Sequence, residues 1–106
     1  MKRSLLFSLL LLPLAVLAAD GDYTIVIKDH RFQPAELAVP SGKKIKLVVD
    51  NQDATPEEFE SHELNREKVI AGHSSATIFI GPLQPGRYPY FGEFHADTAK
   101  GVIVAK

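Results

Sequence analysis

The feature that most constrains the fold is the regular alternation of short apolar segments with proline and glycine turns after residue 20. Between Lys43 and Asp50, the apolar residues Ile45, Leu47 and Val49 fall on every second position. This period of two is typical of a half-buried β-strand, and no segment keeps a helical period for more than one turn. Turn signals that recur about every 8–12 residues are typical of a β-sandwich or barrel.

The pattern predicts about seven short strands in a single all-β domain. They cover residues 23–28, 37–39, 43–50, 58–64, 75–80, 87–91 and 101–105. The segment from Phe32 to Pro34 is expected to be a bend, because it ends in proline. The segment from Asn65 to Lys68 is expected to be a short helical turn.

The first 18 residues have the layout of a secretory signal peptide. A basic start, Lys2-Arg3, precedes an apolar run from Leu5 to Leu17, and Ala18 supplies the small residue before a cleavage site. The run is shorter than the roughly 20 residues of a spanning helix, although an uncleaved membrane anchor is the alternative. We therefore expect cleavage after Ala18, export to the periplasm, and a single folded domain over residues 19–106.

The composition excludes several classes of protein. There is no cysteine, so a packed core and not disulfides must stabilise the exported domain, and cysteine-based catalysis is excluded. Without Lys2 and Arg3, ten basic residues remain against 13 acidic ones, a net charge of about −3. No basic stripe suggests a nucleic-acid partner, and no motif of a serine hydrolase is present.

Three segments of the chain, in the same order as in a known family, carry a resemblance to that family. They are Phe32-x-Pro34 with Leu37-x-Val39-Pro40-Ser41-Gly42; Asn51-x-Asp53-x-x-Pro56-Glu57-Glu58-Phe59; and Pro85-Gly86-x-Tyr88-x-Tyr90 running to His95 and Gly101-Val102-Ile103-Val104. Together they resemble the cupredoxins over nearly the whole chain after the leader. The resemblance implies a Greek-key β-sandwich of the cupredoxin-like kind.

The same resemblance implies that a blue-copper centre is missing. In cupredoxins a type 1 copper ion is bound by two histidines, a cysteine and a methionine, because a thiolate and imidazoles bind both oxidation states in one geometry. The matching positions here are Glu57, Gly92, His95 and Ala99, so only the second histidine is kept. Type 1 copper is therefore not expected.

A narrower likeness comes from the Glu57–Ser61, Glu67–Ile70 and Tyr90–His95 segments. They resemble the small periplasmic cupredoxin-like proteins of bacterial iron-transport systems, which are related to the N-terminal domain of EfeO-type proteins. This resemblance implies binding of an iron or copper ion. It also implies a partner, namely an iron-transport membrane permease or its periplasmic components.

If the family geometry holds, Glu57 and His95 lie side by side at one pole of the sandwich. We predict Glu57, His95 and Glu93 as metal ligands, with Glu58 or Asp97 as a fourth ligand or a supporting group. Carboxylates with one imidazole suit Fe(III), Fe(II) or Cu(II). The alternative is that this acidic pole is a solvated surface without a metal.

Other acidic residues and histidines have weaker interpretations. Glu60 with His62 would form a second, surface metal site, or else only a charged sheet face. Glu67 is expected to pair with Lys68 or Arg66, or to face water. The remaining turn histidines, His30 and His73, are expected to face solvent, and Phe94 is a candidate to shield a metal site from water.

Three functions remain open at this point. The first is a metal-binding or redox accessory protein of iron uptake. The second is a ferroxidase, the only enzymatic activity that the chain suggests, which needs an open coordination position. The third is a metal-free sandwich that binds a partner protein through its acidic face, in which case binding would weaken with salt.

Overall fold

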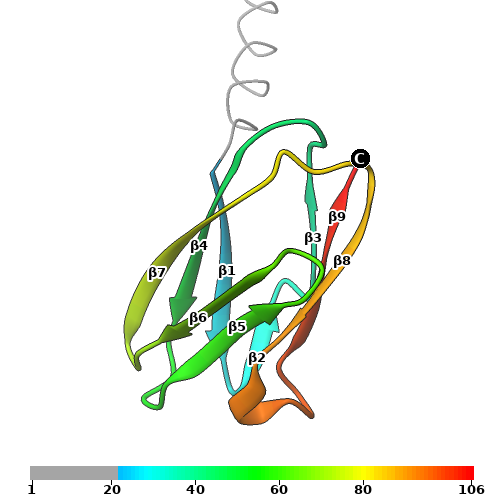
Figure 1. Ribbon diagram of the computed structural model, residues 1–106. Coiled ribbons are helices and arrows are strands. Elements are labelled where there is room, and N and C mark those ends of the chain that lie inside the picture. The colour runs from blue at the N-terminus through cyan, green and yellow to red at the C-terminus, as the bar shows by residue number, and fades with distance from the viewer. Residues whose placement is uncertain (1–21) are drawn as a thin grey trace, which may run out of the picture.

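The computed structural model describes residues 22–106, which form a two-layer β-sandwich (Figure 1). One sheet has the strand order β2 (Arg31–Gln33), β1 (Asp22–Lys28), β4 (Ile45–Asn51), β7 (Ser74–Ile80). The other has the order β3 (Glu36–Val39), β9 (Lys100–Ala105), β8 (Gly86–Phe91), β5 (Glu57–Ser61), β6 (Arg66–Ile70). A single 3-10 turn, η1 (Glu93–His95), is the helical element of this part of the chain.

The prediction of an all-β sandwich is confirmed, with nine strands in the described residues instead of about seven. The strand β1 pairs with β4 in parallel, and β3 pairs with β9 in parallel, whereas the other neighbours are antiparallel. The predicted signal peptide and its cleavage site lie outside the described residues. No helix within residues 22–106 is apolar and long enough to cross a membrane.

Two local predictions were wrong in part. The bend expected from Phe32 to Pro34 begins only at Pro34, because Phe32 and Gln33 belong to the short strand β2, which pairs with the end of β1. The expected helical turn near residue 66 is the edge strand β6, whose register with β5 runs from Glu57↔Ile70 to Ser61↔Arg66. An edge strand rich in charged residues has no apolar alternation, so only its pairing partner reveals it.

The core lies between the two sheets. The alternation in β4 buries Ile45, Leu47 and Val49 completely, as the period of two predicted. Phe59 on β5 packs against Tyr90 on β8 with ring centroids 4.7 Å apart, and Phe32 on β2 meets the Tyr90 ring edge-on at 5.0 Å. The β1–β2 turn and η1 lie side by side at one end of the sandwich, which we call the pole (Figure 1).

Candidate metal centre

The turn between β1 and β2 carries the first residue of the site, His30. Asp29 and His30 both have positive φ angles, 53° and 59°, as a two-residue hairpin turn of type I′ requires. The Asp53 carboxylate, from the loop after β4, accepts hydrogen bonds from both backbone N–H groups, at 2.8 Å and 3.0 Å. A loop 23 residues away in sequence therefore fixes this strained turn.

The Asp53 carboxylate is kept ionised by the same contacts. Burial acts to raise its pKa, but the hydrogen bonds from the His30 and Asp29 N–H groups outweigh burial and bring the pKa below its ordinary value. Asp53 is therefore an anion beside the His30 ring, whose Nδ1 lies 3.5 Å from Asp53 Oδ2.

Glu57, the first residue of β5, supplies a buried carboxylate that is only 1% exposed. Its Oε2 accepts hydrogen bonds from the N–H groups of Glu58 and Phe94, at 3.0 Å and 3.2 Å. Its Oε1 lies 2.6 Å from His95 Nδ1, within hydrogen-bond distance. A polar group this deeply buried is tolerated because both of its oxygens have a partner.

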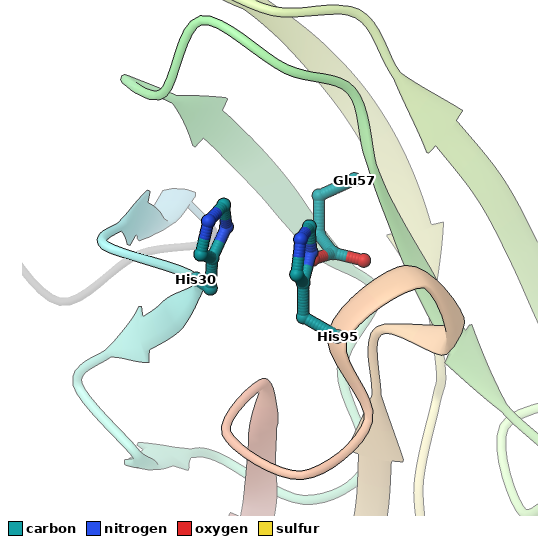
Figure 2. Close-up of side chains that lie close together, drawn as sticks. All are labelled: His30, Glu57 and His95. Atoms are coloured by element: carbon teal, nitrogen blue, oxygen red, sulfur yellow. The ribbon is translucent and has the colours of Figure 1, made fainter.

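His95 ends η1 and joins the other two residues of the site. Its ring stacks on that of His30, with centroids 3.6 Å apart and planes 13° apart. Figure 2 shows the two imidazoles face to face, with the Glu57 carboxylate directed at His95. One ligand atom from each of His30, Glu57 and His95 lies within 4.8 Å of the others, which is close enough for one ion to bridge all three. We call these three residues the pole site.

The pole site opens into a cavity. The cavity has a volume of about 430 Å³ and is lined by His30, Phe94, His95, Ala96, Asp97 and Thr98. Phe94 is half exposed at its rim, so it only partly covers the imidazoles. An ion or a small ligand can reach the two histidines from solvent through this cavity.

A second group of residues lies on the other face of β5. Alternation along the strand directs Glu58 and Glu60 away from Glu57, and Glu60 pairs directly with Glu67 on β6. One oxygen from each of Glu58, Glu60, Glu67 and Glu93 lies within 4.8 Å of the others. We call these four residues the carboxylate cluster.

Glu58 is the unusual member of the carboxylate cluster. It is 3% exposed, and its Oε1 is buried without a hydrogen-bond partner. Burial is the main cause that raises its pKa to about 8, and the neighbouring Glu67 and Glu60 carboxylates raise it in the same direction. A buried carboxylate oxygen without a partner, among three others, fits a cation-binding position.

The structure divides the five predicted ligands into two groups. Glu57 and His95 meet in the pole site, whereas Glu58 and Glu93 belong to the carboxylate cluster. Asp97 is exposed and belongs to neither group, although it lines the cavity beside the pole site. The five predicted ligands therefore do not all come together, and Glu57 and Glu58 separate because neighbours on a strand face opposite sides.

Sequence reasoning missed His30, which it placed in solvent. The signal was the two-residue turn Asp29-His30, but it is recognisable only once the following residues are assigned to β2. Glu67 was expected to pair with a basic neighbour, yet none of the ion pairs within residues 22–106 involves it. His62 is exposed and tilted against Phe91, and it is not part of the carboxylate cluster.

The two donor sets suit different ions. A type 1 copper centre does not fit, because positions 92 and 99 hold Gly and Ala and the chain has no cysteine. Two imidazoles and one carboxylate suit Cu(II), Fe(II) or Zn(II), since imidazole binds borderline ions well. Four carboxylates suit hard cations such as Fe(III), Mn(II) or Ca(II).

Comparison with known protein families gives an independent indication of the family to which the chain belongs. Residues 3–105 match the family model of the cupredoxin-like domain. The chain is also 52% identical over 80 residues to RP394, an uncharacterized protein of Rickettsia prowazekii (strain Madrid E). That match covers 76% of this chain and 64% of the relative, so the chain spans less than two thirds of the relative's length.

Solved structures with the same fold include copper proteins. The reduced auracyanin of Roseiflexus castenholzii has a TM-score of 0.67 and 16% identity over 83% of this chain and 98% of its own. Auracyanin A, a blue copper protein of Chloroflexus aurantiacus, has a TM-score of 0.70 and 15% identity over 80% and 98%. Amicyanin from Paracoccus versutus has a TM-score of 0.63 and 15% identity over 83% of each chain. At these identities the likeness is one of fold.

Proposed function

Because the chain belongs to the cupredoxin-like domain family, we propose that it is a metal-binding protein whose pole site takes a transition-metal ion through His30, Glu57 and His95. The observation that carries this proposal is the contact of a buried carboxylate with an imidazole nitrogen at 2.6 Å, under a second, stacked imidazole. The buried carboxylate supplies a ligand oxygen in a fixed position, and the cavity supplies a route of entry.

The pole site is best suited to Cu(II). Affinity of a nitrogen and oxygen site for divalent ions rises along the first-row series to copper, and imidazole is a good ligand for it. Metal ions bind histidine in its deprotonated form, so we expect Cu(II) binding to weaken as the pH falls.

The carboxylate cluster supports the second half of the proposal, which is an iron site. Fe(III) is a hard cation that favours carboxylate oxygens, and the carboxylate cluster brings four of them within 4.8 Å of one another. The two sets lie close in the sequence, since β5 supplies adjacent ligands, Glu57 and Glu58. The chain would thus hold copper and iron on opposite faces of one strand.

The proposed biological role is that of an exported accessory protein of iron uptake. The signal-like first 18 residues support export to the periplasm, and the resemblance to the cupredoxin-like proteins of iron-transport systems supports the role. In that role the protein would bind iron before its transfer to a membrane permease. Ferroxidase turnover would be the enzymatic form of the same role, and it would show as repeated oxidation of Fe(II) per protein.

A metal titration tests the proposal. We expect Cu(II) to saturate the pole site at one equivalent, with an affinity reduced at least 100-fold in Glu57→Gln and in His95→Ala. His73→Ala is the matched control, because His73 is an exposed turn histidine that belongs to neither group, and it should bind as the wild type does. Equal affinity of the wild type and the two pole-site variants would overturn the proposal.

A further inference from the structure

Two polar side chains outside the pole site hold the segment that carries His30. His30 lies on a two-residue turn before β2, which is only three residues long. Its side chain is 44% exposed. The hairpin is packed into the core through Phe32, but the half-exposed His30 ring lies outside that packing, so contacts at the turn itself contribute to where the imidazole lies.

Asp53 is the first of these side chains. It accepts hydrogen bonds from the N–H groups of Asp29 and His30, one on each carboxylate oxygen. Asp53 is itself fixed, because its N–H donates to Asn51 Oδ1 at 3.0 Å and Asn51 is completely buried. The turn is thereby attached to the end of β4.

Thr98 is the second. Its hydroxyl donates to the backbone carbonyl of His30 at 2.6 Å, and it also lies 3.4 Å from the carbonyl of His95. The Thr98 N–H donates to the same His95 carbonyl at 3.1 Å. One side chain therefore connects the segment of His30 to the segment of His95, which are 65 residues apart in the sequence.

Each contact acts on a different part of the turn. Asp53 binds the N–H groups of the turn, and Thr98 binds the carbonyl of His30. The backbone of His30 is thus held at both of its polar groups, by side chains from the loop after β4 and the loop before β9. From this held backbone the His30 ring stacks on His95, with 3.6 Å between ring centroids.

We propose that Thr98 and Asp53 are positioning residues that hold the His30 imidazole over His95 and so make the pole site a site of two imidazoles. The inference rests on the proposed metal-binding function. Groups that orient a metal ligand without touching the metal contribute about 10–100-fold to affinity. Loss of the Thr98 hydroxyl should therefore release His30 and leave Glu57 and His95 to bind alone.

Three variants of the protein test the role of Thr98, with Cu(II) as the probe. Thr98→Val removes the hydroxyl at nearly the same shape, Thr98→Ser keeps it, and Thr77→Val is the control at an exposed threonine of β7. We expect affinity to fall about tenfold in Thr98→Val and to be restored in Thr98→Ser. The electron paramagnetic resonance spectrum should change from two coordinated nitrogens to one in Thr98→Val, as in His30→Ala.

A double-mutant cycle separates positioning from general loosening of the loop. If Thr98 acts through His30, then adding Thr98→Val to His30→Ala lowers the affinity no further. Full additivity of the two losses, or a wild-type spectrum in Thr98→Val, would overturn the inference. Asp53→Asn retains one acceptor oxygen, so we expect it to lower the Cu(II) affinity less than Thr98→Val does. This loss should also disappear in the His30→Ala background.

The proposed function and this inference fail in different ways. If the wild type binds no Cu(II), the proposed function fails, and the positioning role is then decided in the metal-free protein. There, a nuclear Overhauser effect between the ring protons of His30 and His95 reports the stacked pair. Its loss in Thr98→Val, but not in Thr98→Ser, supports the inference, and its persistence in Thr98→Val overturns it.

Discussion

At the scale of single residues, the buried Glu57 carboxylate limits the size of the side chain that fits beside it at position 92. A Cβ atom at Gly92 would lie 2.6 Å from Glu57 Oε2 and 2.9 Å from the carbonyl oxygen of Glu58. Position 92 corresponds to the cysteine of blue-copper proteins in the family resemblance. A side chain there and a buried carboxylate at position 57 compete for the same space, so the glycine at position 92 leaves room for the Glu57 carboxylate.

The variant Gly92→Ala should therefore damage the pole site. The new methyl group must displace either Glu57 or the backbone of Glu58, and the contact between Glu57 and His95 is lost. We expect Cu(II) affinity to fall by at least tenfold, measured by competition with a chelator. Gly86→Ala is the control, because a Cβ there has 3.7 Å to its nearest neighbour, and an equal loss in both variants would contradict the account.

Glu58 should make the metal-free protein less stable in base. Its pKa is raised from 4.5 to about 8, so between these values the folded state keeps a proton that the unfolded state has lost. Stability is then present below pH 4.5 and falls as the pH rises towards 8.

Urea unfolding with a chelator at pH 5 and pH 8 measures how steeply the free energy of unfolding changes with pH. Glu58→Gln should flatten this slope and should be more stable than the wild type at the higher pH, whereas Glu63→Gln at an exposed position should leave it unchanged. A wild-type slope in Glu58→Gln would mean that another group carries the effect.

At the scale of the elements, β5 and η1 each contribute residues to both the pole site and the carboxylate cluster. Glu57 and Glu58 leave β5 on opposite faces, and η1 supplies Glu93 to the carboxylate cluster and His95 to the pole site. Yet β5 joins β8 through a single bridge, Glu60↔Phe91. The position of β5 therefore depends on side-chain contacts as well as on its ladders.

Ser61 supplies such a contact. Its hydroxyl donates to the carbonyl of Pro89 on β8 at 2.7 Å and accepts the N–H of Leu64 at 3.1 Å, in a buried position. Ser61→Ala leaves both groups unpaired, so we expect the free energy of unfolding to fall by about 1–3 kcal/mol. Ser75→Ala, at an exposed hydroxyl, should cost less, and an equal loss in the two variants would show that the Ser61 contact is not needed.

The sequence predicted the elements whose signal is local. The alternation of Ile45, Leu47 and Val49 located β4, and the faces of Phe59 and Ser61 on β5 were also predicted. The strand β6 was missed because its charged residues resemble a solvated turn until β5 pairs with them. The position of His30 was missed because it depends on contacts with residues 23 and 68 positions away.

At the scale of the whole molecule, a core of apolar side chains replaces disulfides. Sixteen apolar residues are buried in the described part of the chain, and the chain has no cysteine. The aromatic cluster of Phe32, Phe59 and Tyr90 lies at the pole end of that core. Phe32 and Phe59 each lie two residues after a member of the pole site, His30 and Glu57, so the cluster connects the pole site to the core.

Truncating the centre of this cluster should destabilise the whole domain. Phe59 is completely buried, so Phe59→Ala leaves a cavity, and we expect a loss of about 3–5 kcal/mol in urea unfolding. Phe79→Ala removes the same atoms at a position that is 48% exposed and should cost much less. A loss below about 1 kcal/mol for Phe59→Ala would contradict the assignment of this cluster to the core.

Anomalous X-ray diffraction from crystals grown with Cu(II) shows whether His30, Glu57 and His95 bind one metal ion. We expect one anomalous peak at the ring edges of the two histidines, about 2.0–2.2 Å from one nitrogen of each and from a Glu57 oxygen. A peak confined to other surface residues, or none at the pole at saturating Cu(II), would contradict the account.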